Sequence, residues 1–226
     1  MMLFVTDECR RLGLRAGALV FRNIRVESRN LALTEAIRQE ARLAQLRYAG
    51  PTAIRALPEV AAFRELLRRV GANPRRDQPS VERLLGFALK RGDLPDINSL
   101  VDAYNLVSIR SLCSLGAHDL DRIDLPVSLQ ILTGSEPFTP LGTDRPTSIQ
   151  AGEFGYVDAR GRVLCRLDVM QADFSKVTAA TKNVILIVEG STAHKEEQLR
   201  HTVEDAITVV KEYCSGTAEI VARPGK

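Results

Sequence analysis

The 226-residue sequence contains no tryptophan, only four cysteines and three histidines, and no run of 18 apolar residues. A helix needs about 20 apolar residues to cross a bilayer, so we expect no membrane span. The cysteines lie far apart, form no CxxC pair and do not cluster with histidines. This distribution argues against a zinc site and indicates reduced thiols in the cytoplasm. We therefore expect neither a metal nor a cofactor.

The start of the chain, MMLFVTDECRRLG, has no basic leader and only a short apolar stretch. A secretory signal peptide needs both features, so we expect a cytoplasmic protein. The sequence also has no GxxxxGK[ST] loop for nucleotide phosphates.

Acidic residues are scarce in the first part of the chain. Residues 1–91 carry 18 Lys and Arg against nine Asp and Glu, whereas residues 92–226 carry 13 against 19. A basic half can attract phosphate backbones. The excess can equally reflect an arginine-rich composition on solvated helix faces, since 17 of the 18 cations are arginine. If RNA binds, we expect it at four residues around the RRVGANPRR loop: Arg68, Arg69, Arg75 and Arg76.

The hydrophobic pattern changes character along the chain. The first part predicts two strands and then three helices with apolar residues at three- and four-residue steps. After residue 125, alternating and continuous apolar stretches predict strands, and a long amphipathic helix covers them. The predicted strands are 2–6, 17–26, 127–134, the hairpin 154–168, 183–190 and 218–222, and the helices are 33–49, 58–71, 79–92 and 196–214.

These elements predict an α+β fold with mixed β-sheets flanked by helices. We expect a single domain over residues 1–226. Its basic N-terminal part covers residues 1–91, and its core covers residues 92–226.

A further predicted helix, within Leu94–Ile109, has no lysine, arginine or glutamate, although solvated helix faces are normally charged. Asn98, Asp102 and Asn105 follow at i, i+4 and i+7 and share one face. Both flanks are apolar, so we expect a buried helix whose polar stripe lines a cleft, with Asn105 nearest the cavity. The stripe can either hydrogen-bond neighbouring backbone or bind a ligand, because buried polar groups need partners.

The stretch GAHDLDRID, residues 116–124, follows this helix. His118 can act as a general base, but it has no obvious partner, so we favour either a position at the surface or a role in supporting another site residue. Asp119 and Asp121 can bind a cation or cap turns. We favour caps, because no third acid has suitable spacing.

Two segments in this order and at this distance carry a family resemblance. INSLVDAYNLVSIRSLCSLGAHDLDRI (97–123) and VLCRLDVMQADFSKVTAATKNVILIVEG (163–190) resemble the B3/B4 domain, the tRNA-editing module of the phenylalanyl-tRNA synthetase beta chain. The loop of residues 134–166 fits between them. The chain looks most like free-standing members of the family. The resemblance implies binding of aminoacyl-tRNA and hydrolysis of a mischarged ester in trans. We do not expect a complete aminoacyl-tRNA ligase, because the chain is too short to hold an aminoacylation core as well.

The resemblance also assigns pocket positions. The family's Thr-Asn pair corresponds to Tyr104 and Asn105, and its Pro and His, two residues apart, correspond to Ser114 and Gly116. The family's Glu that recognises the tyrosine hydroxyl corresponds to Asp173, a shorter carboxylate. Only Asn105 is unchanged, so we expect the pocket to fit a different side chain or ligand, or to need a bridging water to reach the tyrosine hydroxyl. Gly116 enlarges that pocket.

An aminoacyl ester is already activated, so its hydrolysis needs little beyond a positioned water and oxyanion support. We expect the catalytic residues to be Asn105, Asp173 and Ser175. Ser175 and Lys176 can equally belong to an exposed loop. The expected substrate-binding residues are Asn98, Asp102, Tyr104, Ser114, Gly116 and Lys176. Two other functions fit the sequence: a non-catalytic module for an amino acid or RNA, and an enzyme on an unrelated small molecule.

Overall fold

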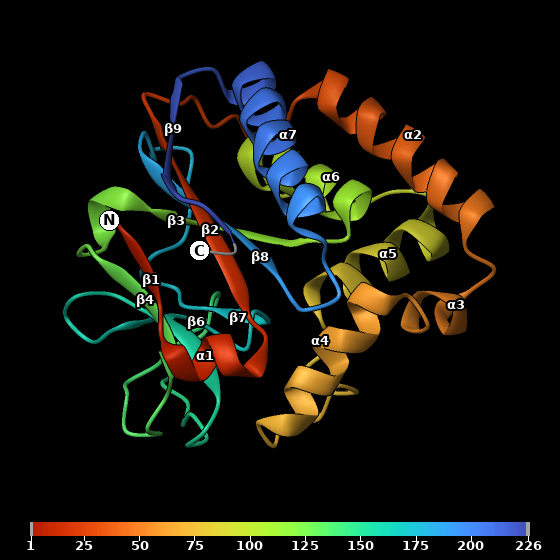
Figure 1. Cartoon of the computed structure of the whole chain (residues 1–226). Helices are drawn as coiled ribbons and strands as arrows, with labels where there is room; N and C mark the ends of the chain where they lie inside the picture. Colours follow the sequence, from red (N-terminus) through yellow and green to blue (C-terminus); the bar gives the residue numbers. More distant parts are fainter. Residues whose placement is uncertain (1, 225–226) are drawn as a thin grey trace.

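Two β-sheets lie face to face in the computed structural model of the protein, which describes residues 2–224 (Figure 1). The first, the four-stranded sheet, is antiparallel and has the strand order β3-β8-β2-β9. Its strands are β2 (Arg15–Arg22), β3 (Ser114–Asp119), β8 (Val184–Gly190) and β9 (Thr217–Ala222). β8 is buried along its whole length between two neighbours, which confirms the prediction of a central strand from the run NVILIVEG.

The second, five-stranded sheet has the order β1-β4-β5-β6-β7. β1 pairs with β4 in parallel and the other pairs are antiparallel, so this sheet is mixed. Its strands are β1 (Leu3–Val5), β4 (Val127–Ile131), β5 (Phe154–Val157), β6 (Val163–Arg166) and β7 (Met170–Gln171). The predicted α+β fold with mixed sheets is confirmed.

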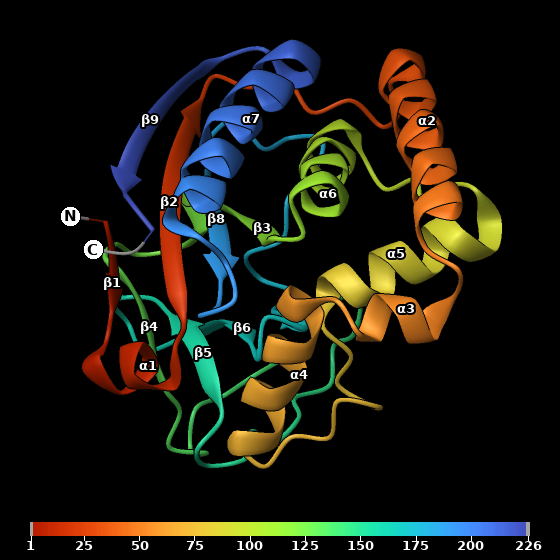
Figure 2. The ribbon, with the colours of Figure 1, turned by 45° about the vertical axis from the view of Figure 1, so that its right-hand side comes forward.

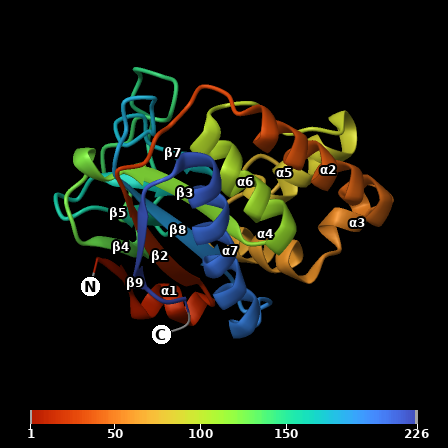
Figure 3. The ribbon, with the colours of Figure 1, turned by 90° about the horizontal axis from the view of Figure 1, so that it is seen from above.

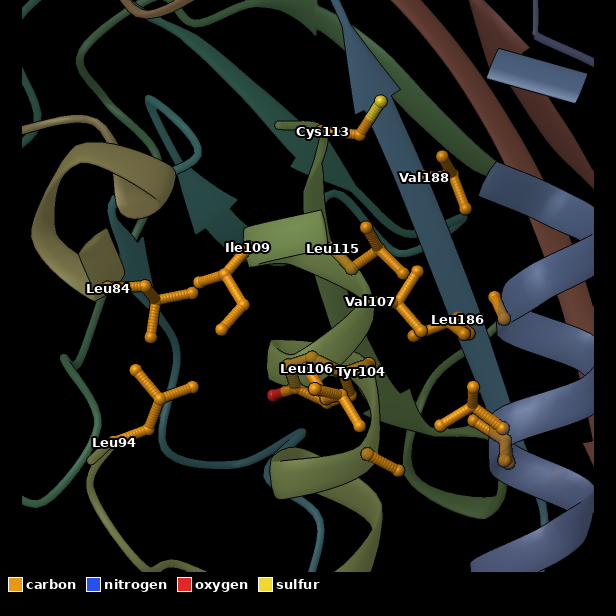
Figure 4. Packing of buried hydrophobic residues seen from close by; sticks show 14 of the residues in the cluster. Leu84, Leu94, Tyr104, Leu106, Val107, Ile109, Cys113, Leu115, Leu186 and Val188 are labelled. Carbon is orange, nitrogen blue, oxygen red and sulfur yellow. The ribbon is translucent and has the colours of Figure 1, made fainter. Parts of the chain in front are cut away.

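Helices cover the face of the four-stranded sheet that points away from the second sheet (Figures 2 and 3). α6 (Ser99–Ser111) and α7 (Glu196–Cys214) pack on this face, and α2 (Leu31–Arg47) and α5 (Ser80–Arg91) pack on α6. In Figure 4, Val107 of α6 meets Leu115 and Leu186 of the sheet. Because α6 is enclosed on several sides, most of its residues are apolar.

The alternation of β8 divides the core in two. Val184, Leu186 and Val188 join the helical cluster, while Ile185 and Ile187 join the cluster between the sheets. α4 (Pro58–Arg69) seals the edge of this second cluster with Phe63 and two leucines. Glu189 is next in the series that faces the second sheet, so the fold carries a carboxyl group into an apolar layer.

Five short elements lie outside the sequence-based prediction: α1 (Asp7–Leu12), α3 (Pro51–Arg55), the 3-10 helix η1 (Leu120–Arg122), β3 and β7. β3 was missed because SLGAHD is short of β-branched and aromatic residues; pairing with β8 fixes its conformation. Over residues 2–224, no helix combines the length and apolarity that a membrane crossing requires.

Candidate functional site

The polar stripe of α6 divides into two parts. Asn98 is the N-cap: its Oδ1 accepts hydrogen bonds from the backbone N–H groups of Leu100 and Val101 at 3.1 and 3.0 Å. Asp102 Oδ1 accepts from the N–H of Ile97 at 3.1 Å, and burial raises the pKa of Asp102 to about 6. Asn98 and Asp102 therefore hydrogen-bond neighbouring backbone, which is the first of the two roles expected for the stripe.

Asn105 differs from both. Within residues 2–224 its side chain has no hydrogen-bond partner, and it is half-buried. Asp102 is buried, and Asn98 and Asn105 are half-buried; that the stripe lines a cleft with Asn105 nearest the cavity stays a prediction. Asn98 is half-buried because it caps a helix that begins from an exposed loop at Ile97. Asn105 keeps its amide available to a ligand or a water.

β3 presents Ser114, Gly116 and His118 toward the five-stranded sheet, because residues two apart on a strand share a face. A Cβ atom added at Gly116 would meet no atom within 4 Å. The position that is His in the editing family is therefore open space here. The buried hydroxyl of Ser114 lies one step along the same face.

Three elements meet at Ser114. Its hydroxyl is hydrogen-bonded to that of Ser80, the first residue of α5, and Ser80 Oγ also donates to Asp168 Oδ2 at 3.3 Å. Ser80 therefore links Ser114 to Asp168. It does not cap its own helix, because the first turn of α5 has no side-chain cap. Asp168 lies in the turn between β6 and β7.

This turn has an unusual backbone. Leu167 and Asp168 have φ values of 56° and 55°, and the N–H of Val169 donates to Arg166 O at 3.0 Å. Such a type I′ turn favours Asn and Gly, and other residues pay a conformational cost there. The turn places Leu167 in the core and directs Asp168 to the two serine hydroxyls. Strained residues of this kind cluster at functional sites.

Glu189 completes a group of polar residues between the sheets. It is 1% exposed and pairs with Ser114 across the β3–β8 ladder. Its Oε2 accepts a hydrogen bond from the hydroxyl of Tyr156, whereas its Oε1 is buried without a partner among residues 2–224. We call this group the acid cluster; its members are Ser80, Ser114, Tyr156, Asp168 and Glu189.

Burial controls the charge of the acid cluster. Burial raises the pKa of Asp168 to about 7, although hydrogen bonds from Ser114 and Ser80 and the charge of Arg83 each lower it in part. Burial and the Asp168 carboxyl raise the pKa of Glu189 well above its usual value. Cys165, half-buried nearby, has its pKa raised in the same way, so its thiol stays protonated and is a poor nucleophile. At neutral pH the cluster therefore retains protons.

Asp173 and Lys176 form an ion pair at the surface. Lys176 Nζ donates to both carboxylate oxygens of Asp173 at 2.9 Å, and the N–H of Gly142 donates to Oδ1 at 2.9 Å. The Lys176 contact lowers the pKa of Asp173. Asp173 thus holds the loop at Gly142 in place. That Asp173 and Asn105 serve one pocket stays a prediction.

Ser175 is fully buried, so the alternative that it lies in an exposed loop is wrong. Its hydroxyl is hydrogen-bonded to His118 Nδ1 at 2.9 Å. His118 is itself buried, not at the surface, and burial lowers its pKa to about 4. The imidazole is therefore neutral at physiological pH. Asp119 accepts from the N–H of Asp121, as expected of a turn cap.

The four predicted RNA-binding arginines are exposed but not all unpaired. Arg68 pairs with Glu65, and Arg69 donates to the carbonyl of Leu12. Arg75 lines a groove of about 430 Å³ with Arg55, Arg64, Pro74, Gln78 and Glu82. Arg76 pairs with Asp77 and lines a neighbouring groove of about 380 Å³ beside Arg166 and Met170.

The sequence of residues 62–215 matches the B3/4 domain family. The chain belongs to this family. Among solved structures it is similar to an N-terminal fragment of the phenylalanyl-tRNA synthetase beta-subunit from Pyrococcus horikoshii, at 14% identity and a TM-score of 0.50. The similarity covers 96% of this chain and 50% of the fragment, so the chain spans about half its length. No curated protein matched the sequence.

Sequence reasoning missed the two carboxyl groups of this B3/4 domain that lie deepest beside β3. A signal for Glu189 was present, since it is the only charged residue in NVILIVEG and follows Ile185 and Ile187 on one face. Asp168 had no such signal, because the sequence RLDVM contains no Asn-Gly or Asp-Gly pair and so does not predict a type I′ turn. Residues 2–224 contain no group of three or more His, Cys, Asp and Glu side chains suited to a metal ion.

Proposed function

We propose that this B3/4 domain, acting as one unit, binds the amino-acid moiety of an aminoacyl-tRNA and hydrolyses its ester in trans. The observation that carries the proposal is the open space at Gly116, beside the buried Ser114 hydroxyl. Both are positions where the family's editing module has pocket residues. The space replaces a histidine side chain, so the pocket accepts a ligand different in shape from tyrosine.

The proposed chemistry relies on positioning. An amide can both donate and accept, so Asn105 can orient the ester carbonyl or the attacking water. Ser175 acts through His118, to which it is hydrogen-bonded at 2.9 Å, and so supports the wall of the pocket. Asp173 can bind a ligand hydroxyl or ammonium only if that group displaces the ammonium of Lys176 from its carboxylate. Asn105 and then Asp173 are the candidates for direct contact with the substrate, and Ser175 is a positioning residue.

The tRNA body would lie against the arginine-rich N-terminal part. The groove lined by Arg55, Arg64 and Arg75 contains one opposing carboxyl group, Glu82, so it is net positive. Phosphate neutralisation releases counterions, and affinity should fall steeply with salt. Replacement of Arg68, Arg69, Arg75 and Arg76 together by alanine should weaken binding at low salt and flatten its salt dependence.

A panel of mischarged tRNAs tests the proposal. Deacylation of at least one by the wild type, with loss in Asn105→Ala and in Asp173→Ala while both variants stay folded, supports it. Wild-type rates in both variants would remove these residues from the mechanism. The change Asp144→Asn, at an exposed loop residue, is a matched control for altered charge.

A second function, binding without catalysis, is favoured by one observation. Asp173 and Ser175 are both already engaged, by Lys176 and His118 respectively, in the protein without a ligand. Absence of deacylation on every charged tRNA, with amino-acid or RNA binding retained, would establish this function instead.

A further inference from the structure

The acid cluster offers acceptors that the protein does not use. Glu189 Oε1 is enclosed and has no hydrogen-bond donor among residues 2–224. Asp168 Oδ2 accepts a long hydrogen bond from Ser80 at 3.3 Å, and the Ser114 hydroxyl also lies close to this carboxyl. A buried acceptor without a donor loses solvation without compensation. Such a group in a native structure points to a missing partner.

The cluster also borders the open space of the candidate pocket. Ser114 and Gly116 share one face of β3, and Glu189 lies opposite Ser114 on the same face of the sheet. Asp168 reaches Ser114 from the β6–β7 turn and is half-buried, as is Cys165 beside it. A group that enters at Gly116 therefore meets the Ser114 hydroxyl and the two carboxyl groups next.

We propose that the acid cluster binds the ammonium group of the amino-acid ligand, which donates to Asp168, Glu189 Oε1 and the Ser114 hydroxyl. The proposal rests on the proposed function for the nature of the ligand and adds the group that it recognises. An ammonium has three N–H donors and no acceptor, which suits an acceptor-rich pocket.

Other occupants fit less well. A divalent metal would require more ligands than this cluster provides, since no suitable group of His, Cys, Asp and Glu exists among residues 2–224. A water would satisfy Glu189 Oε1, but it carries no positive charge and so would not offset the cost of ionising two neighbouring carboxyl groups. The cation that acts on Asp168 within the protein is Arg83 of α5, and its effect is the smallest of those on this carboxyl.

Binding should be linked to proton release. Without a ligand, burial and mutual repulsion keep protons on Asp168 and Glu189, and a bound ammonium favours their ionised forms. The other titratable or charged groups that face Asp168 are Arg83 from α5, Cys165 from β6 and Tyr156 from β5. The thiol and phenol stay neutral, because their pKa values are raised. Affinity for a cationic ligand should therefore rise from pH 5 to about pH 7, and it should fall again above about pH 8, where the ammonium of the ligand loses its own proton.

The test uses the full chain and the amides of the 20 L-amino acids, each compared with its N-acetylated form. Titration calorimetry at pH 7 in two buffers of different ionisation enthalpy measures affinity and proton release together. We expect at least one amide to bind with release of a proton. N-acetylation should weaken this amide about tenfold or more, the value of a charged hydrogen bond.

Variants locate the site. Asp168→Asn and Glu189→Gln keep the shape of each side chain, and each should weaken the amide about tenfold and reduce proton release. Asp144→Asn, at an exposed loop, should bind as the wild type does. Equal affinity for free and acetylated amides would overturn the proposal, as would wild-type binding by both cluster variants or no saturable binding by any amide.

The outcomes separate this inference from catalysis. Deacylation that is indifferent to N-acetylation of the aminoacyl group would retain the proposed function and refute the ammonium site. Ammonium-dependent binding of the amides with no deacylation of any charged tRNA would retain the site and refute hydrolysis.

Discussion

Replacing Asp168 by asparagine should make the protein more stable at alkaline pH. Burial raises the pKa of this carboxyl from 3.8 to about 7. In the unfolded chain it ionises near its ordinary value. Between these two pH values the folded state binds the proton more tightly, so the wild type loses stability as pH rises. Asparagine mimics the protonated acid and does not titrate, so the variant escapes this loss.

The size follows from the shift. Each unit of pKa difference corresponds to about 1.4 kcal/mol, so a shift of about three units amounts to at most about 4 kcal/mol. The stabilisation by the protonated Asp168 carboxyl is fully present below pH 4 and is lost as pH rises through 7. Water that reaches the half-buried carboxyl reduces the figure. We expect the variant to exceed the wild type by about 2–4 kcal/mol at pH 8 and to match it at pH 4.

Urea unfolding from pH 4 to 8.5, followed by far-ultraviolet circular dichroism, measures this difference. Asp158, Glu136 and Asp173 have lowered pKa values and change stability in the opposite direction in acid. They titrate equally in both proteins, so their effects cancel in the difference between variant and wild type. Asp144→Asn, which lies in an exposed loop, controls for the change in net charge.

Parallel stability curves for the wild type and Asp168→Asn would refute the reasoning. The carboxyl would then be ionised at neutral pH in the folded protein, and the acid cluster would hold a different distribution of protons. A variant that is less stable at every pH would show instead that Ser80 and Ser114 require an ionised partner.

Four further changes test the fold around the site. Arg64→Ala should cost about 3–5 kcal/mol in urea unfolding, because it leaves the 4% exposed Glu82 without its partner at 2.8 Å. Asn98→Ala should cost about 1 kcal/mol through loss of the α6 cap, and serine at this position should recover most of it. Gly116→Ala should leave the melting temperature nearly unchanged, since its Cβ enters open space. Gly155→Ala should lower it clearly, because its Cβ would lie 2.8 Å from a backbone oxygen.

The sequence predicts the long elements of this fold well. The helices of residues 58–71 and 196–214 correspond to α4 and α7, and the run of residues 183–190 corresponds to β8. Their periodicity carries the information, because each buries one face or all of its surface. β3 and the two-residue β7 have no such period, and their conformations come from the strands beside them.

The candidate site was predictable only in part. Ser114 and Gly116 were identified through resemblance to the editing domain, and the structure adds the space that Gly116 leaves. Asn98 shows the limit of spacing arguments, because an amide on the same helical face as Asn105 is a cap. Asp168 lies 54 residues from Ser114 in sequence, and only the left-handed turn after β6 brings their elements together.

The acid cluster brings together three features that each lower stability. A type I′ turn contains leucine and aspartate where glycine or asparagine is favoured. The carboxyl group of Glu189 follows Ile185 and Ile187 in the layer between the sheets, and one of its oxygens has no partner among residues 2–224. A glycine leaves room beside them. Apolar residues would fill this region at lower free energy, so the arrangement is better explained by ligand binding than by folding. An Asp168→Asn variant that is more stable than the wild type but binds the amide more weakly would show that this carboxyl lowers stability and serves ligand binding.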